Sequence, residues 1–467
     1  MNPIPLSPDS SETPMGMAKF EPVLMEAVGV AEGHTLESYR SRGGYAALER
    51  LLAGSQPAEV VEMVKSSGLR GRGGAGFMTG VKWGFLPKDH PGPIYFCVNA
   101  DESEPGTFNN RFLMEDDPHQ VLEGTIISCY ATRATTAYIY LRYEYPRSLE
   151  RLQAAIDEAY AAGYLGGDIK GSGFSLDIYL HRGAAAYICG EETGLIESIE
   201  GKRAWPRIKP PFPAIEGVFR KPTVVNNVET VACVAQIARR GVDWFRSIGV
   251  PADPENPRDP GSYGPKLYCL SGHVEKPGCY EAPLGITLRE LIDDYGGGVW
   301  KGRRAKAAIP GGISMGLATE AEFDIPLDFK GPGSVGCMGL GTAAVVVLDE
   351  TVSIVDYLHN SCRFFAHESC GQCTPCREGT SWSLRILERI RAGKGRLKDL
   401  EILLEMGSTM GMMPGSTICG LADGAAWPIK NAITKFRGEF EDYIKRTNPE
   451  GWMVTEAVPA LEIVGAH

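Results

Sequence analysis

The chain has 467 residues, 43% hydrophobic and 22% charged, and a formal net charge of -11 at pH 7. This composition is typical of a soluble globular protein, and the length exceeds what one hydrophobic core serves, so we expect two to four domains. The acidic balance argues against a general nucleic-acid binder, which needs a basic face. The sequence contains no run of about 18 apolar residues, so we expect no membrane-spanning helix.

The N-terminal residues 1–34 carry neither a basic segment followed by an apolar run nor an arginine-rich presequence. We expect a tail over these residues, disordered over the first 16, on a cytosolic protein. From about residue 35 to 67, apolar side chains recur at helical spacing, for example Leu48, Leu51 and Leu52.

The next stretch, Gly68–Phe85, contains a G-x-G-x-x-G pattern at Gly71, Gly73 and Gly76. Glycines at this spacing let backbone N–H groups approach a phosphate, because no side chain stands between them and the ligand. In the usual dinucleotide fingerprint a strand precedes the glycines and a helix follows. Here a helical turn precedes them and the apolar strand Ile94–Val98 follows. The loop therefore indicates a nucleotide cradle that is not an ordinary Rossmann one; the alternative is a glycine-rich surface turn.

Alternating helices and strands follow the cradle. The strand Ile94–Val98 runs into a cluster of polar acceptors, from Asn99 to Glu104. The expected elements after it are a helix over 111–130, a strand over 137–143, a helix over about 148–161 and a strand over 174–180. This alternation predicts an α/β domain with a largely parallel sheet, which we place at residues 35–255.

Two smaller units are expected after this domain. Two β-like runs within 266–280, a helix over 287–295 and a run over 305–310 predict a compact β-grasp-like domain at residues 256–345. From about residue 352 the apolar spacing is helical, and four helices with short connections predict a bundle at residues 346–445. The last of them runs from about Leu421 to Tyr443, with Pro428 near its start or at a kink. Residues 446–467 are expected to be a peripheral tail.

Four of the twelve cysteines form a metal-binding pattern inside the predicted bundle. Cys370, Cys373 and Cys376 stand at C-x-x-C-x-x-C spacing, and Cys419 follows later in the chain. Three close thiolates and one distant thiolate are typical of a [4Fe–4S] cluster. Structural zinc sites more often use two separated pairs or Cys/His mixtures, but zinc stays possible on spacing alone. Four unrelated buried cysteines are the remaining alternative.

A nucleotide cradle and an electron-transfer cluster in one chain suggest a redox relay, in which a flavin takes up hydride and passes electrons singly to the cluster. Seven motifs then carry a family resemblance: GLRGRGGAGF, NADESEPG, RGAAAYICGEET, KPPFP, PTVVNNVET, ESCGQCTPCREG and STICGLADGAAWP. In this order they resemble the NADH-binding flavoprotein subunit of respiratory complex I (the F subunit of NADH:quinone oxidoreductase), over roughly residues 35 to 440. The implied fold is a Rossmann-like FMN and NADH domain of α/β class, a ubiquitin-like β-grasp domain and a four-helix bundle carrying the cluster.

The resemblance implies an FMN site built from four segments, in which Lys82 and Glu102 also tune the charge of the reduced flavin. Its implied residues are Gly71, Arg72, Gly73, Gly74, Lys82, Asn99, Asp101, Glu102, Ser103, Tyr187, Gly190, Glu191, Glu192, Thr223, Asn226 and Asn227. Amides and a lysine suit a phosphate, Asn and Asp suit ribityl hydroxyls, and Glu suits the polar edge of the ring. The cluster ligands implied are Cys370, Cys373, Cys376 and Cys419.

For NADH, the resemblance implies an adenine held among aromatic rings and three polar contacts. The implied residues are Phe77, Phe85, Glu104, Glu192, Lys209 and Phe212. The prolines around Phe212 stiffen its backbone. Because Glu104 and the other carboxylates would repel the extra phosphate of NADPH, we predict a preference for NADH. Two positions depart from the family pattern, Met78 and Gly420, where the family often has proline.

The implied activity is that of the electron-input subunit of a proton-translocating NADH:quinone oxidoreductase. Its implied partners are a thioredoxin-like [2Fe–2S] subunit and a large multi-cluster iron–sulfur subunit. Such a complex would lie at the cytoplasmic face of a membrane that this chain does not enter. The nearest alternative is the diaphorase subunit of an NAD-dependent hydrogenase or formate dehydrogenase. A zinc-stapled, nucleotide-sensing module without turnover is a more distant one.

Overall fold

The computed structural model describes residues 20–453. The chain divides after Glu350 into two compact units, which are treated separately below. The predicted tails were residues 1–34 and 446–467. Most of each, residues 1–19 and 454–467, lies outside the described residues. No helix among residues 20–453 is both long and apolar enough to cross a membrane.

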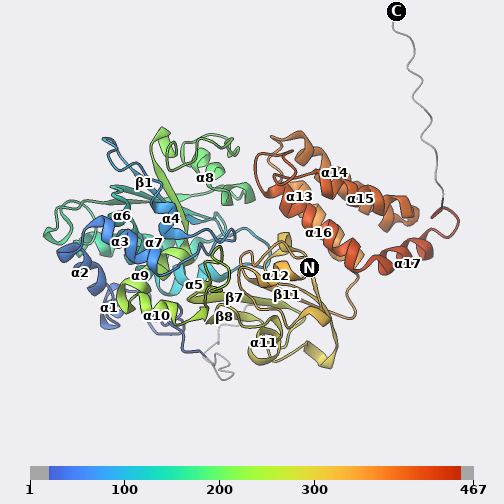
Figure 1. Ribbon diagram of the computed structural model, residues 1–467, viewed down its shortest axis with the longest axis horizontal. Coiled ribbons are helices and arrows are strands. Elements are labelled where there is room, and N and C mark those ends of the chain that lie inside the picture. Colours follow the sequence, from blue (N-terminus) through green and yellow to red (C-terminus); the bar gives the residue numbers. More distant parts are fainter. Residues whose placement is uncertain (1–19, 454–467) are drawn as a thin grey trace, which may run out of the picture. The chain divides into compact units, whose positions relative to one another are not determined.

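A four-stranded parallel sheet forms the centre of the first unit (Figure 1). The strands run in the order β3-β2-β1-β4, so β1 lies between β2 and β4. Their bounds are β1 Tyr95–Ala100, β2 Thr136–Leu141, β3 Asp177–Arg182 and β4 Thr223–Asn227. Strand β1 reads as a nearly continuous apolar run because helices cover both faces of a parallel sheet. The predicted parallel α/β layer is confirmed.

Helices pack around this sheet, and α6 and α9 lie against each other. Helix α6 is buried on almost every side although it is not apolar all round, because its buried polar side chains His119, Gln120 and Glu123 are hydrogen-bonded. The predicted helix over 111–130 is in fact two, α5 and α6, because Pro118 starts a new helix after Asp117. The helices of this domain are α1 Leu36–Ser41, α2 Ala46–Gly54, α3 Pro57–Ser66, α4 Thr79–Trp83, α5 Asn109–Asp116, α6 Pro118–Thr132, α7 Pro146–Ala161, α8 Glu192–Ile199, α9 Val228–Arg240 and α10 Val242–Arg246.

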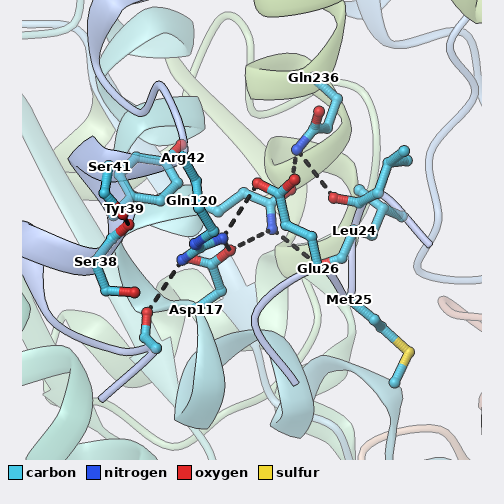
Figure 2. Close-up of polar contacts among 12 residues, drawn as sticks. Leu24, Met25, Glu26, Ser38, Tyr39, Ser41, Arg42, Asp117, Gln120 and Gln236 are labelled. Carbon is cyan, nitrogen blue, oxygen red and sulfur yellow. Dashed lines mark hydrogen bonds and ion pairs between the residues drawn. The ribbon is translucent and has the colours of Figure 1, made fainter. Parts of the chain in front are cut away.

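Residues 20–34, which we expected to belong to a tail, are instead fixed by polar side chains from distant parts of the chain. Figure 2 shows Gln120 donating to the carbonyl of Leu24 over 2.9 Å, and Arg42 placed between Asp117 and Glu26. On the other side, Glu281 accepts hydrogen bonds from the backbone N–H groups of residues 23 to 25 over 2.9–3.1 Å. The segment also buries Val23, Leu24 and Ala27, an apolar signal that we did not use.

A mixed five-stranded sheet follows, in the order β10-β9-β11-β7-β8. Strand β11 runs parallel to β7, whereas the other pairs are antiparallel, which agrees with the predicted β-grasp. The bounds are β7 Pro265–Gly272, β8 Gly278–Pro283, α11 Leu288–Glu290, β9 Ala305–Ile309, β10 Ala318–Thr319, α12 Gly331–Ser334 and β11 Ala344–Asp349. A two-stranded sheet, β5 Gly249–Val250 with β6 Ser262–Tyr263, precedes it.

The second unit is helical between Thr351 and the end of the described residues. Its helices are α13 Ile354–Glu368, α14 Thr374–Arg389, α15 Leu397–Thr409, α16 Leu421–Lys435 and α17 Arg437–Thr447. The predicted helical region is confirmed, but its last helix is two, because the chain leaves helical geometry at Phe436. Pro428 lies inside α16.

Candidate functional site

The glycine loop is a tight hairpin between α3 and α4. Gly71 N–H donates to the carbonyl of Phe77 over 2.8 Å, and Thr79 N–H donates to Leu69 over 2.9 Å. The loop approaches the end of β4 closely: a Cβ added to Gly73 would lie 3.1 Å from the Cβ of Asn227. A side chain at Gly73 would therefore have to displace Asn227 slightly, and the loop lies over the carboxyl end of the strand.

Polar groups gather where β1 and β4 end. Because Asn99 pairs with Asn227 in the parallel register, the two strands deliver their acceptors to the same edge. The Asn99 side chain donates to the carbonyl of Gly190 over 2.9 Å, and Ser103 Oγ donates to Asp101 over 3.0 Å. In open α/β sheets this edge is where ligands bind.

The two asparagines at the end of β4 are themselves held in place. Asn226 Oδ1 accepts from the indole N–H of buried Trp83 over 2.8 Å. Asn227 caps α9, because its Oδ1 accepts from Glu229 N–H over 2.9 Å. The amino end of a helix of 13 residues thus begins beneath the glycine loop, and such an end attracts phosphate.

Glu102 is committed to a structural role. Its carboxylate accepts from the N–H groups of Asn110 and Arg111 over 2.8 and 3.2 Å, and from the Tyr145 hydroxyl over 2.9 Å. Burial raises the pKa of Glu102, although these hydrogen bonds act in the opposite direction. Glu102 thereby fixes the start of α5 next to the strand end.

A chain of alternating charges links the glycine-loop side of the site to α8. Lys82 Nζ lies 2.7 Å from Glu192, Lys209 Nζ lies 3.5 Å from Glu192, and Lys209 lies 2.7 Å from Glu191. Burial disfavours the charged forms, but the lysines hold the pKa of Glu192 below its usual value. Against the same effect of burial, Glu191 and Glu192 raise the pKa of Lys209.

The residues expected to hold NADH include three exposed rings. Phe77, Phe85 and Phe212 are 51%, 55% and 57% exposed, although large aromatic side chains are usually well buried. The rings of Phe77 and Phe85 have centroids 6.0 Å apart. Glu104 accepts a hydrogen bond from the Tyr187 hydroxyl over 2.7 Å, so these two expected site residues do meet.

The structure does not bring two of the expected FMN residues to this group. The guanidinium of Arg72 is buried, donates to the carbonyl of Tyr263 over 2.7 Å and lies near the ring of Phe329. Thr223 begins β4, whereas Asn227 ends it, so strand geometry separates them by about 13 Å. Thr223 and Asn227 are close in sequence, but they lie far apart in space because an extended strand separates them.

Three of the four expected cluster cysteines lie at the starts of two helices, and Cys370 lies in the loop before α14. Cys373 precedes α14 and Cys376 lies in its first turn, while Cys419 stands just before α16. Ile418 N–H donates to the sulfur of Cys373 over 3.4 Å, which places the loop of Cys419 against the C-x-x-C-x-x-C segment. Burial raises the pKa of the Cys376 thiol to about 11. Among residues 20–453, no three His, Cys, Asp or Glu side chains form a group that could hold a metal ion.

The residue types fit the two expected groups, although in the described part of the chain the cysteine side chains are not gathered into one ligand group. A close glycine loop over the amino end of α9, with Lys82 beside it, suits a flavin phosphate. For the cluster, thiols are the ligands that iron–sulfur clusters use. The amino end of α14 attracts a thiolate at Cys376 and so acts against the burial that raises the pKa of this thiol.

Sequence reasoning missed several residues that organise the site. Trp83 orients Asn226, Thr230 accepts a hydrogen bond from Arg72 N–H over 2.9 Å, and Ser314 of the β-grasp domain contacts Glu104. No local pattern marks these residues, since their partners are far away in the chain. Lys266 and Glu229 form a buried ion pair. The only signal for it in the sequence was that each is a charged residue within an otherwise apolar element.

Three family descriptions match the chain. "Nuo51 FMN-binding domain" matches residues 64–236, "SLBB domain" matches residues 267–318, and "NADH-ubiquinone oxidoreductase-F iron-sulfur binding region" matches residues 356–443. The chain therefore carries an FMN-binding domain and an iron–sulfur binding region. The predicted cofactors and the predicted fold class are confirmed, and the zinc alternative finds no support.

Similar proteins and structures agree with this result. An NADH-quinone oxidoreductase F subunit of Rhizobium meliloti, the one numbered 2, is 52% identical over 91% of this chain and 98% of its own length. The corresponding F subunit of Streptomyces coelicolor is 49% identical over 91% of each chain. A crystal structure of an NAD+-reducing [NiFe]-hydrogenase, 36% identical, has a TM-score of 0.74 over 85% of this chain; the match spans only 64% of the hydrogenase chain. The chain belongs to the family of NADH-quinone oxidoreductase F subunits.

Proposed function

We propose that this chain is the electron-input subunit of an NADH:quinone oxidoreductase. It takes hydride from NADH onto FMN and passes single electrons to one [4Fe–4S] cluster. The observation that supports this proposal most is the approach of the glycine loop at Gly73 to Asn227, at the carboxyl end of β4. This approach places a phosphate cradle, a helix amino end and the polar strand ends around one space.

The FMN-binding role falls to the residues around that space. The loop of Gly71, Gly73 and Gly74 and the amino end of α9 would hold the phosphate. Asn99 and Asp101 would bind the ribityl hydroxyls. Arg72 and Thr223 have no direct contact with FMN in this proposal. The Arg72 side chain is buried, and Thr223 begins β4, whereas Asn227 ends it.

The nucleotide-binding role falls to residues at the exposed side of the site. Phe77, Phe85 and Phe212 would surround the adenine, which such rings bind by stacking at little entropic cost. Lys209 is anchored by Glu191 and Glu192, so its position is fixed before the nucleotide arrives.

In this proposal the protein contributes to catalysis by orienting the nicotinamide and flavin rings. FMN, when bound, supplies the chemistry by accepting hydride from the nicotinamide and releasing electrons singly. The protein holds the two rings in register, which reduces the entropic part of the barrier. Lys82, which already contacts Glu192 and the carbonyl of Val225, contributes positive charge at the site. Cys370, Cys373, Cys376 and Cys419 would ligate the cluster.

The test is anaerobic absorbance of the purified chain in the flavin band, before and after NADH is added. Bleaching within the mixing time is the expected result, together with about four irons per chain. A flavin band that NADH leaves unchanged would contradict the proposal. NADPH at the same concentration should bleach the band far more slowly.

The likeness to an NAD+-reducing hydrogenase favours one second candidate, a diaphorase subunit in a hydrogenase or formate dehydrogenase complex. Both candidates share the same flavin chemistry, so only the surrounding complex separates them. Isolation of the native complex followed by assays with NADH and quinone, with hydrogen and NAD+, and with formate and NAD+ decides between them.

The proposed setting is the peripheral arm of a membrane complex at the cytoplasmic face of the inner membrane. The proposed partners are a thioredoxin-like [2Fe–2S] subunit and a large multi-cluster iron–sulfur subunit. Membership of the F-subunit family supports the existence of partner subunits. Pull-down of the chain from a membrane extract, with iron analysis of the co-purifying subunits, tests their identity.

A further inference from the structure

Glu104 is held by the β-grasp domain as well as by the sheet domain. Its Oε1 accepts two hydrogen bonds from Ser314, one from the backbone N–H over 2.8 Å and one from the hydroxyl over 2.6 Å. Its Oε2 accepts from the Tyr187 hydroxyl over 2.7 Å. Glu104 and Ser314 are 210 positions apart in the chain. Burial raises the pKa of Glu104, and these three hydrogen bonds act against that rise.

The turn that carries Ser314 is built for this contact. Gly312 has a φ of +99°, and a Cβ at this position would lie 2.5 Å from Cγ of Glu104. Any residue larger than glycine would therefore push the turn away from the carboxylate. Gly312 N–H donates to the carbonyl of Ala344 over 2.8 Å, which ties the turn to β11 at the centre of the β-grasp sheet.

The hydrogen bonds to Glu104 determine how many acceptor positions of its carboxylate remain for a ligand. A carboxylate has about four acceptor positions. Ser314 takes both positions of Oε1 and Tyr187 takes one of Oε2. Among the contacts of the described residues, one position of Oε2 is left, and its direction is fixed because Ser314 prevents rotation of the group.

We propose that Ser314 is a positioning residue that orients the Glu104 carboxylate toward the ribose of the nucleotide and thereby sets the preference for NADH over NADPH. This inference rests on the proposed function. A fixed carboxylate accepts a hydrogen bond from one ribose hydroxyl and repels a phosphate at the same place. A carboxylate held by fewer hydrogen bonds does both less well. The β-grasp domain thus takes part in nucleotide specificity without touching the nucleotide.

The variant Ser314→Ala, in the full chain with its FMN, tests this inference. Calorimetry should show ADP-ribose binding about tenfold more weakly, because the carboxylate loses the hydroxyl donor and is held only by the backbone N–H of residue 314 and by Tyr187. Binding of 2′-phospho-ADP-ribose should weaken less. The ratio of kcat/KM for NADH to that for NADPH should fall about fivefold, chiefly through KM. The matched control is Ser334→Ala, an exposed serine of the same domain that bonds only within its own turn. FMN content and Tm are measured for each variant to exclude misfolding.

A double-mutant cycle with Glu104→Gln separates a role through Glu104 from a general effect. If Ser314 acts through Glu104, Ser314→Ala adds little to Glu104→Gln. Additive effects, or an unchanged NADH preference in Ser314→Ala, would overturn the inference. Should Ser314→Ala fail to fold, Tyr187→Phe removes the donor to Oε2 and is expected to lower the preference in the same direction. If the unaltered chain bound neither ADP-ribose nor NADH, the proposed function itself would fail, and the inference with it.

Discussion

The polar residues of this site are fixed by one another before any ligand binds. The chain from Lys82 through Glu192 and Lys209 to Glu191 consists of half-buried pairs at 2.7–3.5 Å. Half-buried pairs contribute more than exposed ones, whose charges are screened by water and salt. Preorganised charges cost little rearrangement when a charged ligand arrives.

Loss of the Lys82 ammonium should weaken flavin binding more than it weakens the fold. In Lys82→Met, Glu192 loses its nearest partner and keeps only the longer contact with Lys209. We expect the Kd of FMN to rise about tenfold, the cost of one charged hydrogen bond. Flavin fluorescence on release measures this change. The control is Lys65→Met on α3, whose side chain is exposed; an equal rise there would contradict the prediction.

The buried pair between Lys266 on β7 and Glu229 on α9 should matter for stability. Their atoms lie 2.5 Å apart, with both side chains almost fully buried. Lys266→Met should lower the free energy of unfolding by about 3–5 kcal/mol, because it leaves a carboxylate buried without its counter-charge. Urea titration tests this.

Two further variants serve as comparisons for Lys266→Met. The double variant Lys266→Met with Glu229→Gln should regain at least half of the loss, because neither charge remains. Lys276→Met, an exposed change in the same domain, should cost about 0.5 kcal/mol or less. A double variant less stable than Lys266→Met would argue against an electrostatic cause.

At the scale of elements, the glycine hairpin and β4 meet with almost no spare volume. Gly73→Ala would place a methyl group 3.1 Å from the Cβ of Asn227 and disturb the cap of α9. We expect a loss of about 1–3 kcal/mol in the stability of the FMN-free chain. Gly71→Ala meets only ordinary contacts, at 3.6 Å, and should leave stability within about 1 kcal/mol. Thermal unfolding of the two FMN-free variants compares them; equal Tm values would contradict the close approach.

Most elements could be predicted because their patterns are local. The strand after the cradle was expected at Ile94–Val98 and forms Tyr95–Ala100, since an apolar run between polar loops indicates a buried strand. Strand β11, Ala344–Asp349, was not predicted, although its run of valines is a strand signal. Gly438 follows the break at Phe436 by two residues, but this signal was not used, so the last two helices were expected as one.

The site was predictable where it resembles a family and less so where it depends on tertiary contacts. The motifs identified the glycine loop, the strand-end acceptors and the cysteines, and the structure brings most of these together. The direction of the Arg72 side chain and the contact of Ser314 with Glu104 depend on elements far away in the chain. A single sequence contains no local signal for either.

At the scale of the whole first unit, Glu281 makes stability depend on pH. Burial raises its pKa from the ordinary 4.5 to about 7. The folded state therefore binds this proton more tightly than the unfolded state, so the stability due to Glu281 is fully present below about pH 4.5. It is lost as the pH rises to about 7, by about 3 kcal/mol at most.

Glu281→Gln removes this proton and should remove this part of the pH dependence. Urea titrations of both proteins between pH 5 and 8 provide the measurement. The difference in free energy of unfolding between the unaltered chain and the variant should shrink as the pH rises. Asp117, whose pKa burial raises to about 6, titrates in both proteins and so cancels in this difference. A difference independent of pH would show that Glu281 does not titrate in this range.

The same carboxylate also sets an order of events during synthesis. Glu281 receives the N–H groups of residues 23 to 25, and it lies 258 positions after Val23. At typical rates of about 5–20 residues per second, the ribosome needs roughly 10–50 s to make the intervening chain. The segment around Val23 therefore cannot complete these hydrogen bonds until residue 281 has been made. Until then, the backbone N–H groups of residues 23 to 25 lack their Glu281 acceptor, because it has not yet been synthesised.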